Sequence, residues 1–491
     1  MADDPGKLLI GKGEQPQYLY LPLANRHGLI AGATGTGKTV TLQRLAEAFS
    51  DAGVAVFAAD IKGDLCGLGA AGEPKGKIAE RIASMPWLDH RPQAYPVTLW
   101  DVAGQSGHPL RTTLSEMGPL LLGALLELTD SQQAALYATF QVADRDGLLL
   151  LDLKDLKALL NHLQQHPEVL GEDRALFTGA SGQALLRRLA TLEQQGAEAL
   201  FGEPALQLED ILQPAADGRG RIHLLDASRL VHEAPKVYAT FLLWLLAELF
   251  EQLPERGDAD KPVLALFFDE AHLLFADTPK ALQERLEQVV RLIRSKGVGV
   301  YFVTQSPSDL PDAVLAQLGL RIQHGLRAFT AKEQKSLRAV ADGFRPNPAF
   351  NTLDVLTELG IGEALVGTLE DKGTPAMVRR VAIAPPQSRL GPLSEDERAA
   401  LIRQSPLAGR YERAVDRESA YELLNARAAQ AEAPVAKGKA AGQEQSLGDM
   451  AGELLGGAVG QAMKSAMRQA AGQIGRELVR GLMGSLLGKR R

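Results

Sequence analysis

Residues 32–39 form a complete phosphate-binding loop with the sequence Gly-Ala-Thr-Gly-Thr-Gly-Lys-Thr. The pattern G-x-x-x-x-G-K-[ST] turns backbone N–H groups toward a polyphosphate, and the helix that follows adds the positive end of its dipole. Lys38 can reach the β- and γ-phosphates, and Thr39 can offer its hydroxyl to Mg²⁺. The sequence therefore predicts a site for ATP with Mg²⁺. The predicted nucleotide contacts are Gly32, Ala33, Thr34, Gly35, Thr36, Gly37, Lys38, Thr39 and Val40.

Two adjacent carboxylates follow Val263–Phe268, an unbroken apolar run typical of a parallel strand covered on both faces. Asp269 is placed to hold Mg²⁺ through its hydration shell. Glu270 is placed to orient and polarise the attacking water as a general base. A lone Asp would suggest a slow switch, whereas the pair favours repeated ATP hydrolysis, with Lys38 and Glu270 as catalytic residues.

A third polar position follows another short apolar segment, Gly299–Thr304. We expect Gln305 to lie beside the acidic pair, within reach of the γ-phosphate or the water, and to act as a sensor of the nucleotide. The alternative is a polar strand end without a catalytic role.

The elements around these motifs alternate between strand and helix. A run with strand character, Tyr18–Ala31, precedes the loop, and helical spacing follows over Val40–Phe49. Between residues 114 and 209 we expect four helices, which would interrupt the alternation: Leu120–Leu128, Ser131–Arg145, Leu153–His166 and Ala180–Gln194. We expect closing strands at Gly362–Leu369 and Met377–Ile383. The sequence thus predicts an α/β core in two parts, 1–113 and 216–390, split by a helical insertion at 114–215. A helical extension at 391–430 and a low-complexity linker with an amphipathic tail at 431–491 would follow.

Composition limits the functional classes. The chain has 491 residues, a net charge of −7 and a single cysteine, Cys66, which fits a reducing cytoplasm. The longest apolar stretch, Val237–Phe250, is too short to span a bilayer, and the acidic N-terminus does not resemble a signal peptide. The acidic balance is not that of a general nucleic-acid binder, so DNA would have to meet a local basic patch.

The motifs together resemble the HerA/FtsK superfamily. They are the phosphate-binding loop, Asp-Ile-Lys-Gly-Asp from residue 60, Phe-Phe-Asp-Glu-Ala-His from residue 267 and Val-Thr-Gln-Ser-Pro from residue 303. Longer phrases starting at residues 111, 291 and 344 are similar to a bacterial group of HerA-like ATPases without the N-terminal β-barrel of archaeal HerA. The resemblance implies a RecA-like P-loop NTPase core, a hexamer and descent from DNA translocases.

A ring is also expected because a chain with one motor core must take its transition-state arginine from a neighbour. The resemblance places this arginine at the end of the helix expected near 279–296, and we expect it to be Arg294. The other candidates for this role are Arg291, Arg321 and Arg327. A solvated basic helix end is the alternative.

Two functions stay open at this point. One is an ATP-driven DNA helicase or translocase that threads DNA through its pore, with Lys62 as a DNA contact followed by Lys75 and Lys77. The other is an ATPase that remodels a protein or membrane-associated partner, bound through the C-terminal tail. Lys62 also admits a second interpretation as a nucleotide-site residue, because loops at strand ends line such sites.

Overall fold

The computed structural model describes residues 6–432, apart from residues 258, 276–279, 329, 371 and 372. Contacts within the chain define two units, Met1–Ala426 and Arg427–Arg491. The second unit is described only over residues 427–432, which end helix α15 (Ala420–Glu432). The predicted linker and amphipathic tail lie outside the described residues from 433 onward.

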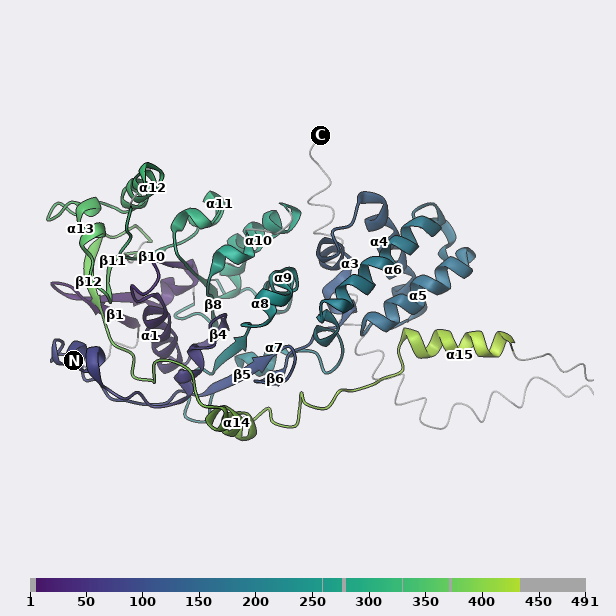
Figure 1. The fold of residues 1–491 in the computed structure, drawn as a ribbon, viewed down its shortest axis with the longest axis horizontal. Helices are drawn as coiled ribbons and strands as arrows, with labels where there is room; N and C mark the ends of the chain where they lie inside the picture. Colours follow the sequence, from purple (N-terminus) through teal and green to yellow (C-terminus); the bar gives the residue numbers. More distant parts are fainter. Residues whose placement is uncertain (1–5, 258, 276–279, 329, 371–372, 433–491) are drawn as a thin grey trace, which may run out of the picture. The chain divides into compact units, whose positions relative to one another are not determined.

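A single twelve-stranded sheet organises the described part of the first unit (Figure 1). The strand order is β2-β1-β12-β11-β10-β3-β9-β8-β4-β7-β5-β6. In this order, each pair of neighbours from β10 through β3 to β6 is parallel. Each pair of neighbours from β2 through β1 to β10 is antiparallel, so β10 joins the two parts of the sheet. The strands are β1 (Lys7–Lys12), β2 (Pro16–Tyr20), β3 (Gly28–Ala31), β4 (Ala55–Asp60), β5 (Val97–Asp101), β6 (His108–Pro109), β7 (Ile222–Asp226), β8 (Leu264–Phe268), β9 (Val298–Thr304), β10 (Leu320–His324), β11 (Glu363–Gly367) and β12 (Arg379–Ile383).

Alternate residues of the central strands pack on opposite faces of the sheet, as the two-residue period of a strand requires. In β8, Leu266 and Phe268 join the core that contains α9 and α10, while Phe267 joins the core that contains α1. Both faces are therefore covered, which explains the unbroken apolar runs in the sequence. The covering helices are α1 (Lys38–Asp51), α9 (Pro235–Gln252) and α10 (Lys280–Ile293).

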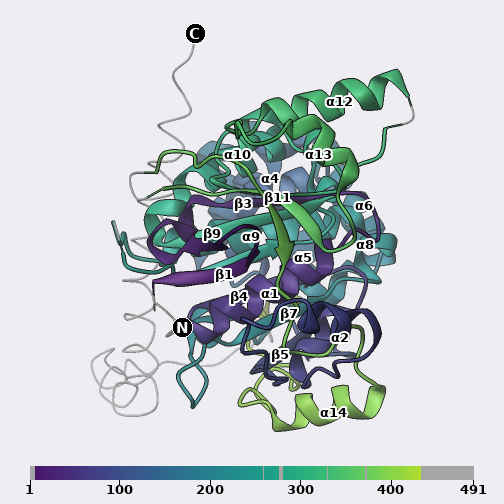
Figure 2. The same ribbon diagram turned by 90° about the vertical axis from the view of Figure 1, so that its left-hand side faces the viewer.

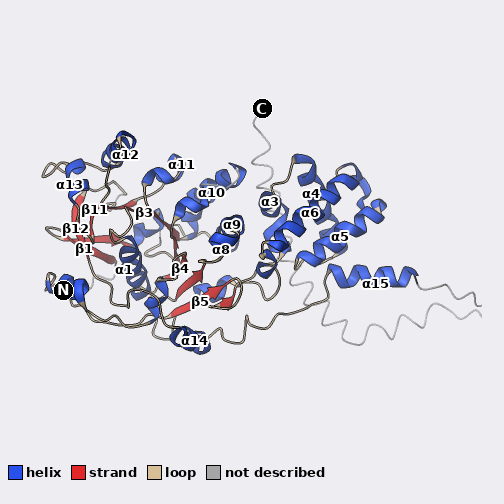
Figure 3. Cartoon of the chain, viewed as in Figure 1, coloured by secondary structure: helices blue, strands red, loops and turns tan. Residues whose placement is uncertain are grey.

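Helices α3 to α6 come between β6 and β7 in the chain. Figure 3 shows these helices grouped together. The predicted helices over 131–145, 153–166 and 180–194 are confirmed, but the first one was misplaced at Leu120–Leu128. It begins at Leu114, because Thr113 and Glu116 form a capping box there, and Gly118 (φ 71°) with Pro119 interrupts its pattern. The boundaries 114–215 for an insertion stay a prediction. The helices are α3 (Leu114–Leu125), α4 (Asp130–Asp146), α5 (Leu153–Gln165), α6 (Gly179–Gln194) and α7 (Leu208–Leu212).

The predicted single run at Tyr18–Ala31 was wrong. Strands β2 and β3 are separated by a 3₁₀-helix, Leu21–Arg26, with Pro22 in its first turn. Proline fixes φ and lacks a backbone donor, which suits the start of a helix and not a strand interior. Strand β1 was not predicted; it pairs with β2 and β12 at the sheet's antiparallel side.

The segment after β12 passes from the sheet toward helices α3 to α6 (Figure 1). Ser388 donates its backbone N–H to Glu47 of α1 at 2.8 Å, and Arg398 of α14 (Glu395–Gln404) pairs with Asp226 at 2.9 Å. The predicted helical extension is two helices, α14 and α15. A non-helical segment separates them because Pro406 follows the end of α14 and Gly409 takes φ 83°.

The remaining helices have 4 to 12 residues and lie in connections between strands. Helices α2, α8, α12 and α13 are labelled in the turned view (Figure 2). Among the helices that the structure describes, none has both the length and the apolarity to cross a bilayer. These helices are α2 (Gly76–Ala83), α8 (Leu230–Glu233), α11 (Asp312–Leu315), α12 (Ala331–Asp342) and α13 (Thr352–Glu358).

Candidate nucleotide-hydrolysis site

The segments with the predicted chemistry leave the sheet at the same edge. Strands β3, β9, β8 and β4 are parallel neighbours, with Ala31 paired to Thr304 and Phe268 paired to both Phe302 and Ala59. The loop 32–39, Gln305 and the pair Asp269–Glu270 therefore follow strand ends that lie side by side. The carboxyl edge of a parallel sheet is where such folds bind ligands.

The phosphate-binding loop has the backbone that its glycines permit. Gly32, Gly35 and Gly37 take φ angles of 153°, 78° and 118°, which side-chain-bearing residues rarely adopt. Lys38 is buried, and its ammonium donates to the carbonyl oxygens of Gly32 (2.6 Å) and Ala33 (3.2 Å). Burial lowers the pKa of Lys38, opposed by the charges of Glu270 and Asp269. The charges of Glu270 and Asp269 thus favour the protonated form of Lys38, the residue that the sequence assigns to the phosphates.

A buried histidine that sequence reasoning missed supports this loop. His324, at the end of β10, approaches Thr41 Oγ1 with Nε2 at 2.8 Å and the carbonyl oxygen of Glu363 with Nδ1 at 2.9 Å. Burial lowers its pKa to about 4, so the ring is neutral at pH 7. A Cβ on Gly32 would lie 2.5 Å from the His324 Cβ, so only glycine fits there. A lone histidine at a strand end gave no signal of this role.

Asp269 directly follows β8 and is buried. Burial raises its pKa to about 6, although the Lys62 charge opposes this effect. Oδ1 of Asp269 accepts the backbone N–H of Glu270 at 3.0 Å. A buried carboxylate with a raised pKa is stabilised by a nearby cation. Together with the half-buried Thr39 hydroxyl, it offers the hard oxygen ligands that Mg²⁺ prefers, so the residues fit the predicted metal.

Glu270 is held in an unusual backbone conformation, with φ 44° and ψ 49°. Left-handed backbone at a non-glycine residue costs energy and is frequent at functional sites. Its Oε1 accepts from Lys62 Nζ at 2.8 Å. Its Oε2 is buried and has no hydrogen-bond partner among the described residues; His272 Nδ1 lies 3.5 Å away. One oxygen of this carboxylate is thus engaged, and the other is left for a further donor.

Lys62 is brought to the nucleotide site by the turn that ends β4. Asp60 accepts the backbone N–H groups of Gly63 (2.7 Å) and Leu65 (2.9 Å), which fixes this turn. Burial would raise the pKa of Glu270, but the hydrogen bond and charge of Lys62 outweigh it and lower that pKa. This position favours the nucleotide-site interpretation of Lys62 over the DNA contact, which stays a prediction.

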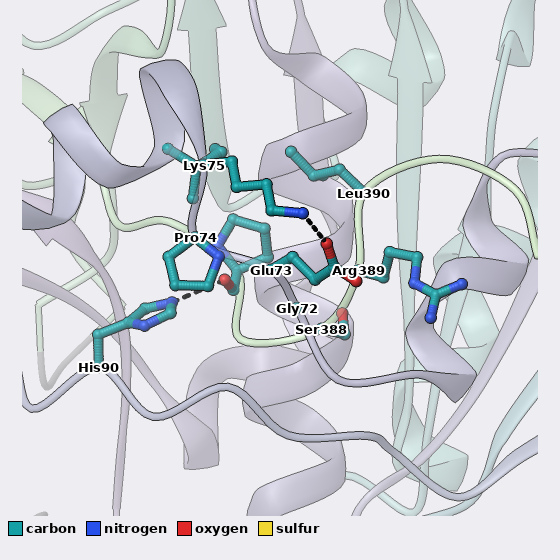
Figure 4. Close-up of a pocket in the computed structure, with 10 residues that line it drawn as sticks. Gly72, Glu73, Pro74, Lys75, His90, Ser388, Arg389 and Leu390 are labelled. Carbon is teal, nitrogen blue, oxygen red and sulfur yellow. Dashed lines mark hydrogen bonds and ion pairs between the residues drawn. The ribbon is translucent and has the colours of Figure 1, made fainter.

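Lys75 also lies against a carboxylate. Its ammonium pairs with Glu73 at 2.6 Å at the rim of a 480 Å³ hollow between residues 72–78 and 386–390, where His90 contacts the Pro386 carbonyl at 2.9 Å (Figure 4). Both partners of the Lys75 pair are exposed, so the pair contributes little to stability.

Gln305 is exposed directly after β9, in a 690 Å³ hollow that it shares with His272 and Asp309. Asp309 Oδ2 accepts from Thr304 Oγ1 (2.7 Å) and from the backbone N–H of Ser306 (2.9 Å), which fixes the turn around Gln305. The geometry brings Gln305 to the same edge as Glu270; its sensing role stays a prediction.

Arg294 lies at the other edge of the sheet. It is exposed in a 3₁₀ turn before β9, and its carbonyl accepts from Asn25, which precedes β3. Of the other candidates, Arg321 donates to the carbonyls of Gly343 (2.8 Å) and Leu315 (3.2 Å), which gives it a structural role. Arg291 and Arg327 are exposed. Arg294 is thus remote from its own chain's phosphate-binding loop, and its action on a neighbour's phosphate stays a prediction.

The chain belongs to the helicase HerA-like C-terminal family, whose model matches residues 7–491. No curated protein is detectably similar in sequence. Solved structures of the bacterial conjugative coupling protein TrwB share the fold. The unbound monoclinic form gives a TM-score of 0.53 at 14% identity, covering 78% of this chain and 90% of that chain.

Two nucleotide complexes of TrwB are similar to the same degree. The complex with the ATP analogue ADPNP gives a TM-score of 0.52 at 15% identity, covering 78% of this chain and 91% of that one. The complex with ADP and Mg²⁺ gives 0.50 at 15% identity, covering 81% and 88%. Identities this low show the fold alone. The predicted α/β P-loop NTPase core of RecA-like type and the resemblance to HerA-like ATPases are confirmed.

Proposed function

We propose that this HerA-like P-loop ATPase is the subunit of a hexameric ring that hydrolyses ATP with Mg²⁺ and uses the energy to translocate DNA. The observation that carries the proposal is the meeting of Lys38, Asp269, Glu270 and Gln305 at the carboxyl edge of four neighbouring parallel strands. Family membership supports a nucleotide-hydrolysing motor.

In this mechanism the loop 32–39 binds the phosphates of ATP through its backbone N–H groups and the N-terminus of α1. Lys38 exchanges its two loop carbonyls for phosphate oxygens, which is favourable because a charged acceptor replaces two neutral ones. Mg²⁺ held by Thr39 and Asp269 would neutralise charge on the β- and γ-phosphates. The sheet edge thus positions the scissile bond.

Glu270 then orients the attacking water and accepts its proton. Lys62 lowers the pKa of the Glu270 carboxyl and so favours the ionised form, which is the form that can accept a proton. We assign the contact with this water to Oε2, which is buried and has no hydrogen-bond partner among the described residues. Gln305, in the adjacent hollow, is the residue that we assign to sensing the γ-phosphate or water.

The position of Arg294 at the opposite edge of the sheet supports the proposed ring. A guanidinium stabilises the charge of a loose phosphoryl-transfer transition state, and one that cannot reach its own site can act only across a subunit boundary. We propose that Arg294 does so in a hexamer.

A second candidate is an ATPase that remodels a protein partner. It is favoured by the net charge of −7 and by the ion pairs that engage Lys62 and Lys75, both suggested as DNA contacts.

ATP turnover measured with and without duplex or single-stranded DNA, at about 50 and about 200 mM salt, separates the two. The proposal expects turnover above that of Lys38→Ala, and stimulation by DNA that weakens as salt rises. Turnover equal to that of Lys38→Ala would refute the ATPase. Turnover insensitive to DNA at low salt would refute DNA as the substrate and leave the protein-directed ATPase.

A further inference from the structure

The loop between α13 and β11 packs against the phosphate-binding loop. The backbone N–H of Gly362 donates to the carbonyl of Thr36 at 2.9 Å, and the Gly362 Cα lies 3.3 Å from where a Cβ on Gly37 would be. The topology requires this proximity: β11 runs antiparallel to β10, so the residues before Glu363 lie at the carboxyl edge of β10 and β3. Residues 359–362 are therefore a fixed wall of the candidate nucleotide site.

Ile361 extends from this wall into solvent. Its exposed fraction is 63%, the largest among the exposed large hydrophobic residues of the described chain. The turn that presents it is held by the backbone N–H of Gly360, which donates to Glu363 Oε2 at 2.9 Å. An aliphatic side chain left in water forgoes the free energy of burial, about 25 cal/mol per Å². A fixed, apolar side chain beside a phosphate-binding loop is therefore suited to be covered by a ligand.

Arg81 reaches the same wall from α2. Its Nη2 donates to the Ile361 carbonyl at 2.8 Å and lies 3.1 Å from where a Cβ on Gly362 would be. The guanidinium is thus anchored at one nitrogen next to Ile361. A planar guanidinium stacks on aromatic rings, with a cation–π contribution of about 0.5–2 kcal/mol in general.

We infer that Ile361 and Arg81 form the subsite for the nucleobase of the bound nucleoside triphosphate. This inference rests on the proposed ATP site and extends it from the phosphates to the base. A purine is flat and has apolar faces, so an aliphatic side chain and a guanidinium plane give it burial and stacking. Contact with the flat faces of the base does not depend on the donor and acceptor pattern at its edges, so burial and stacking by these two side chains act on both purines alike.

Steady-state hydrolysis of ATP and GTP by Ile361→Ser, Ile361→Leu and Arg81→Ala tests the subsite. We expect Ile361→Ser and Arg81→Ala to raise KM for both nucleotides by about threefold to tenfold, with a smaller change in kcat. Ile361→Leu keeps most of the apolar area and should raise KM less than Ile361→Ser does. Inorganic tripolyphosphate, which has no base, should inhibit all variants with the same inhibition constant.

Two surface changes away from the wall are matched controls. Leu176→Ser removes an exposed leucine of the helical segment, and Arg91→Ala removes an exposed arginine paired with Asp89; neither should change KM. An unchanged KM in Ile361→Ser overturns the subsite. Equal weakening of tripolyphosphate overturns it too, since the wall would then only shape the phosphate loop. Loss of oligomer in Ile361→Ser with KM unchanged per assembled ring would make this residue a subunit contact instead.

If the protein were not an ATPase, the same variants would still test the subsite through nucleotide binding. If no protein hydrolyses ATP beyond Lys38→Ala, binding of a fluorescent ATP analogue still reports the subsite. Weaker binding to Ile361→Ser than to Leu176→Ser then supports it, and equal binding overturns it.

Discussion

The Lys62 ammonium lies 2.8 Å from Glu270 Oε1, so an ion pair joins the turn after β4 to the carboxylate after β8. Glu270 is mostly buried, whereas Lys62 is about two-fifths exposed, at 42% for its side chain. Burial would lower the pKa of Lys62, but its hydrogen bond with Glu270 and the charge of Asp269 raise it. The proposed base, Glu270, therefore depends on Lys62, for which the sequence also suggested a DNA contact.

Lys62→Ala should lower basal ATP turnover by about tenfold, because Glu270 loses the partner that fixes its Oε1 and favours its ionised form. Lys62→Arg should restore part of the rate. Steady-state kinetics without DNA provide the measurement, with Lys75→Ala as the control because its pair with Glu73 is exposed. Unchanged basal turnover, together with a DNA-binding salt slope reduced by about one unit, would instead make Lys62 a phosphate contact.

Glu270→Gln should reduce kcat by about 100-fold or more while ATP binding is retained, because the amide keeps the shape of the side chain but cannot take a proton from water. Lys38→Ala should lose binding as well, because it removes the charge at the loop. Single-turnover hydrolysis and binding of a fluorescent ATP analogue separate the two effects. Near-normal turnover in Glu270→Gln would exclude this residue as the base.

The core could be predicted from the sequence because its buried parallel strands are short apolar runs that end at chemically distinctive residues. The strand β8 before Asp269 and the strand β9 before Gln305 follow this pattern. The antiparallel side could not be predicted in the same way. Strand β1 contains Gly11, where a Cβ would lie 2.2 Å from the Ala382 carbonyl oxygen, and such a contact is visible only once β12 is in place.

Site residues could be predicted from the sequence only where they belong to a recognisable motif. Lys38 and Glu270 belong to such motifs, whereas the residues that surround them in the fold do not. His324 comes from a strand almost 300 positions away from Thr41, and Ile361 is one aliphatic residue among many. Their roles arise from the order β11-β10-β3, which places three distant segments at one sheet edge. Local patterns carry no information about that order.

Arg294→Ala subunits and Lys38→Ala subunits should each be nearly inactive alone and regain part of the activity when mixed. In mixed rings, an intact Arg294 from one subunit would face an intact loop of the other. Light scattering with ATP and Mg²⁺ should report a hexamer for each protein. A monomer with full activity would contradict the ring. Additive activity without recovery on mixing would remove Arg294 from the site and turn attention to Arg291 and Arg327.

His27 gives the stability of the fold a defined pH dependence. Its Nε2 contacts the Val290 carbonyl at 2.7 Å, and its Nδ1 accepts the Val300 N–H at 3.0 Å, so only the neutral ring satisfies both bonds. Burial lowers its pKa from 6.5 to about 4 despite the Val290 bond, and the Arg294 charge adds to this effect. His27 of the unfolded chain therefore binds a proton more tightly than His27 of the folded chain, and the two states differ in protonation between about pH 4 and 6.5.

The stabilisation by neutral His27 is accordingly complete above pH 6.5 and is lost as pH falls toward 4, by about 2 kcal/mol at pH 5. Urea unfolding of the unmodified protein and of His27→Asn at pH 8, 7, 6 and 5 measures this contribution. Asparagine is suited to the site because it tolerates the left-handed backbone, φ 57°, that His27 adopts. The difference in unfolding free energy between the two proteins should be constant from pH 8 to 7 and shrink by about 2 kcal/mol by pH 5. Buried carboxylates such as Asp60 titrate in both proteins and cancel in this difference. A difference that stays constant down to pH 5 would show that His27 accepts its proton in the folded chain.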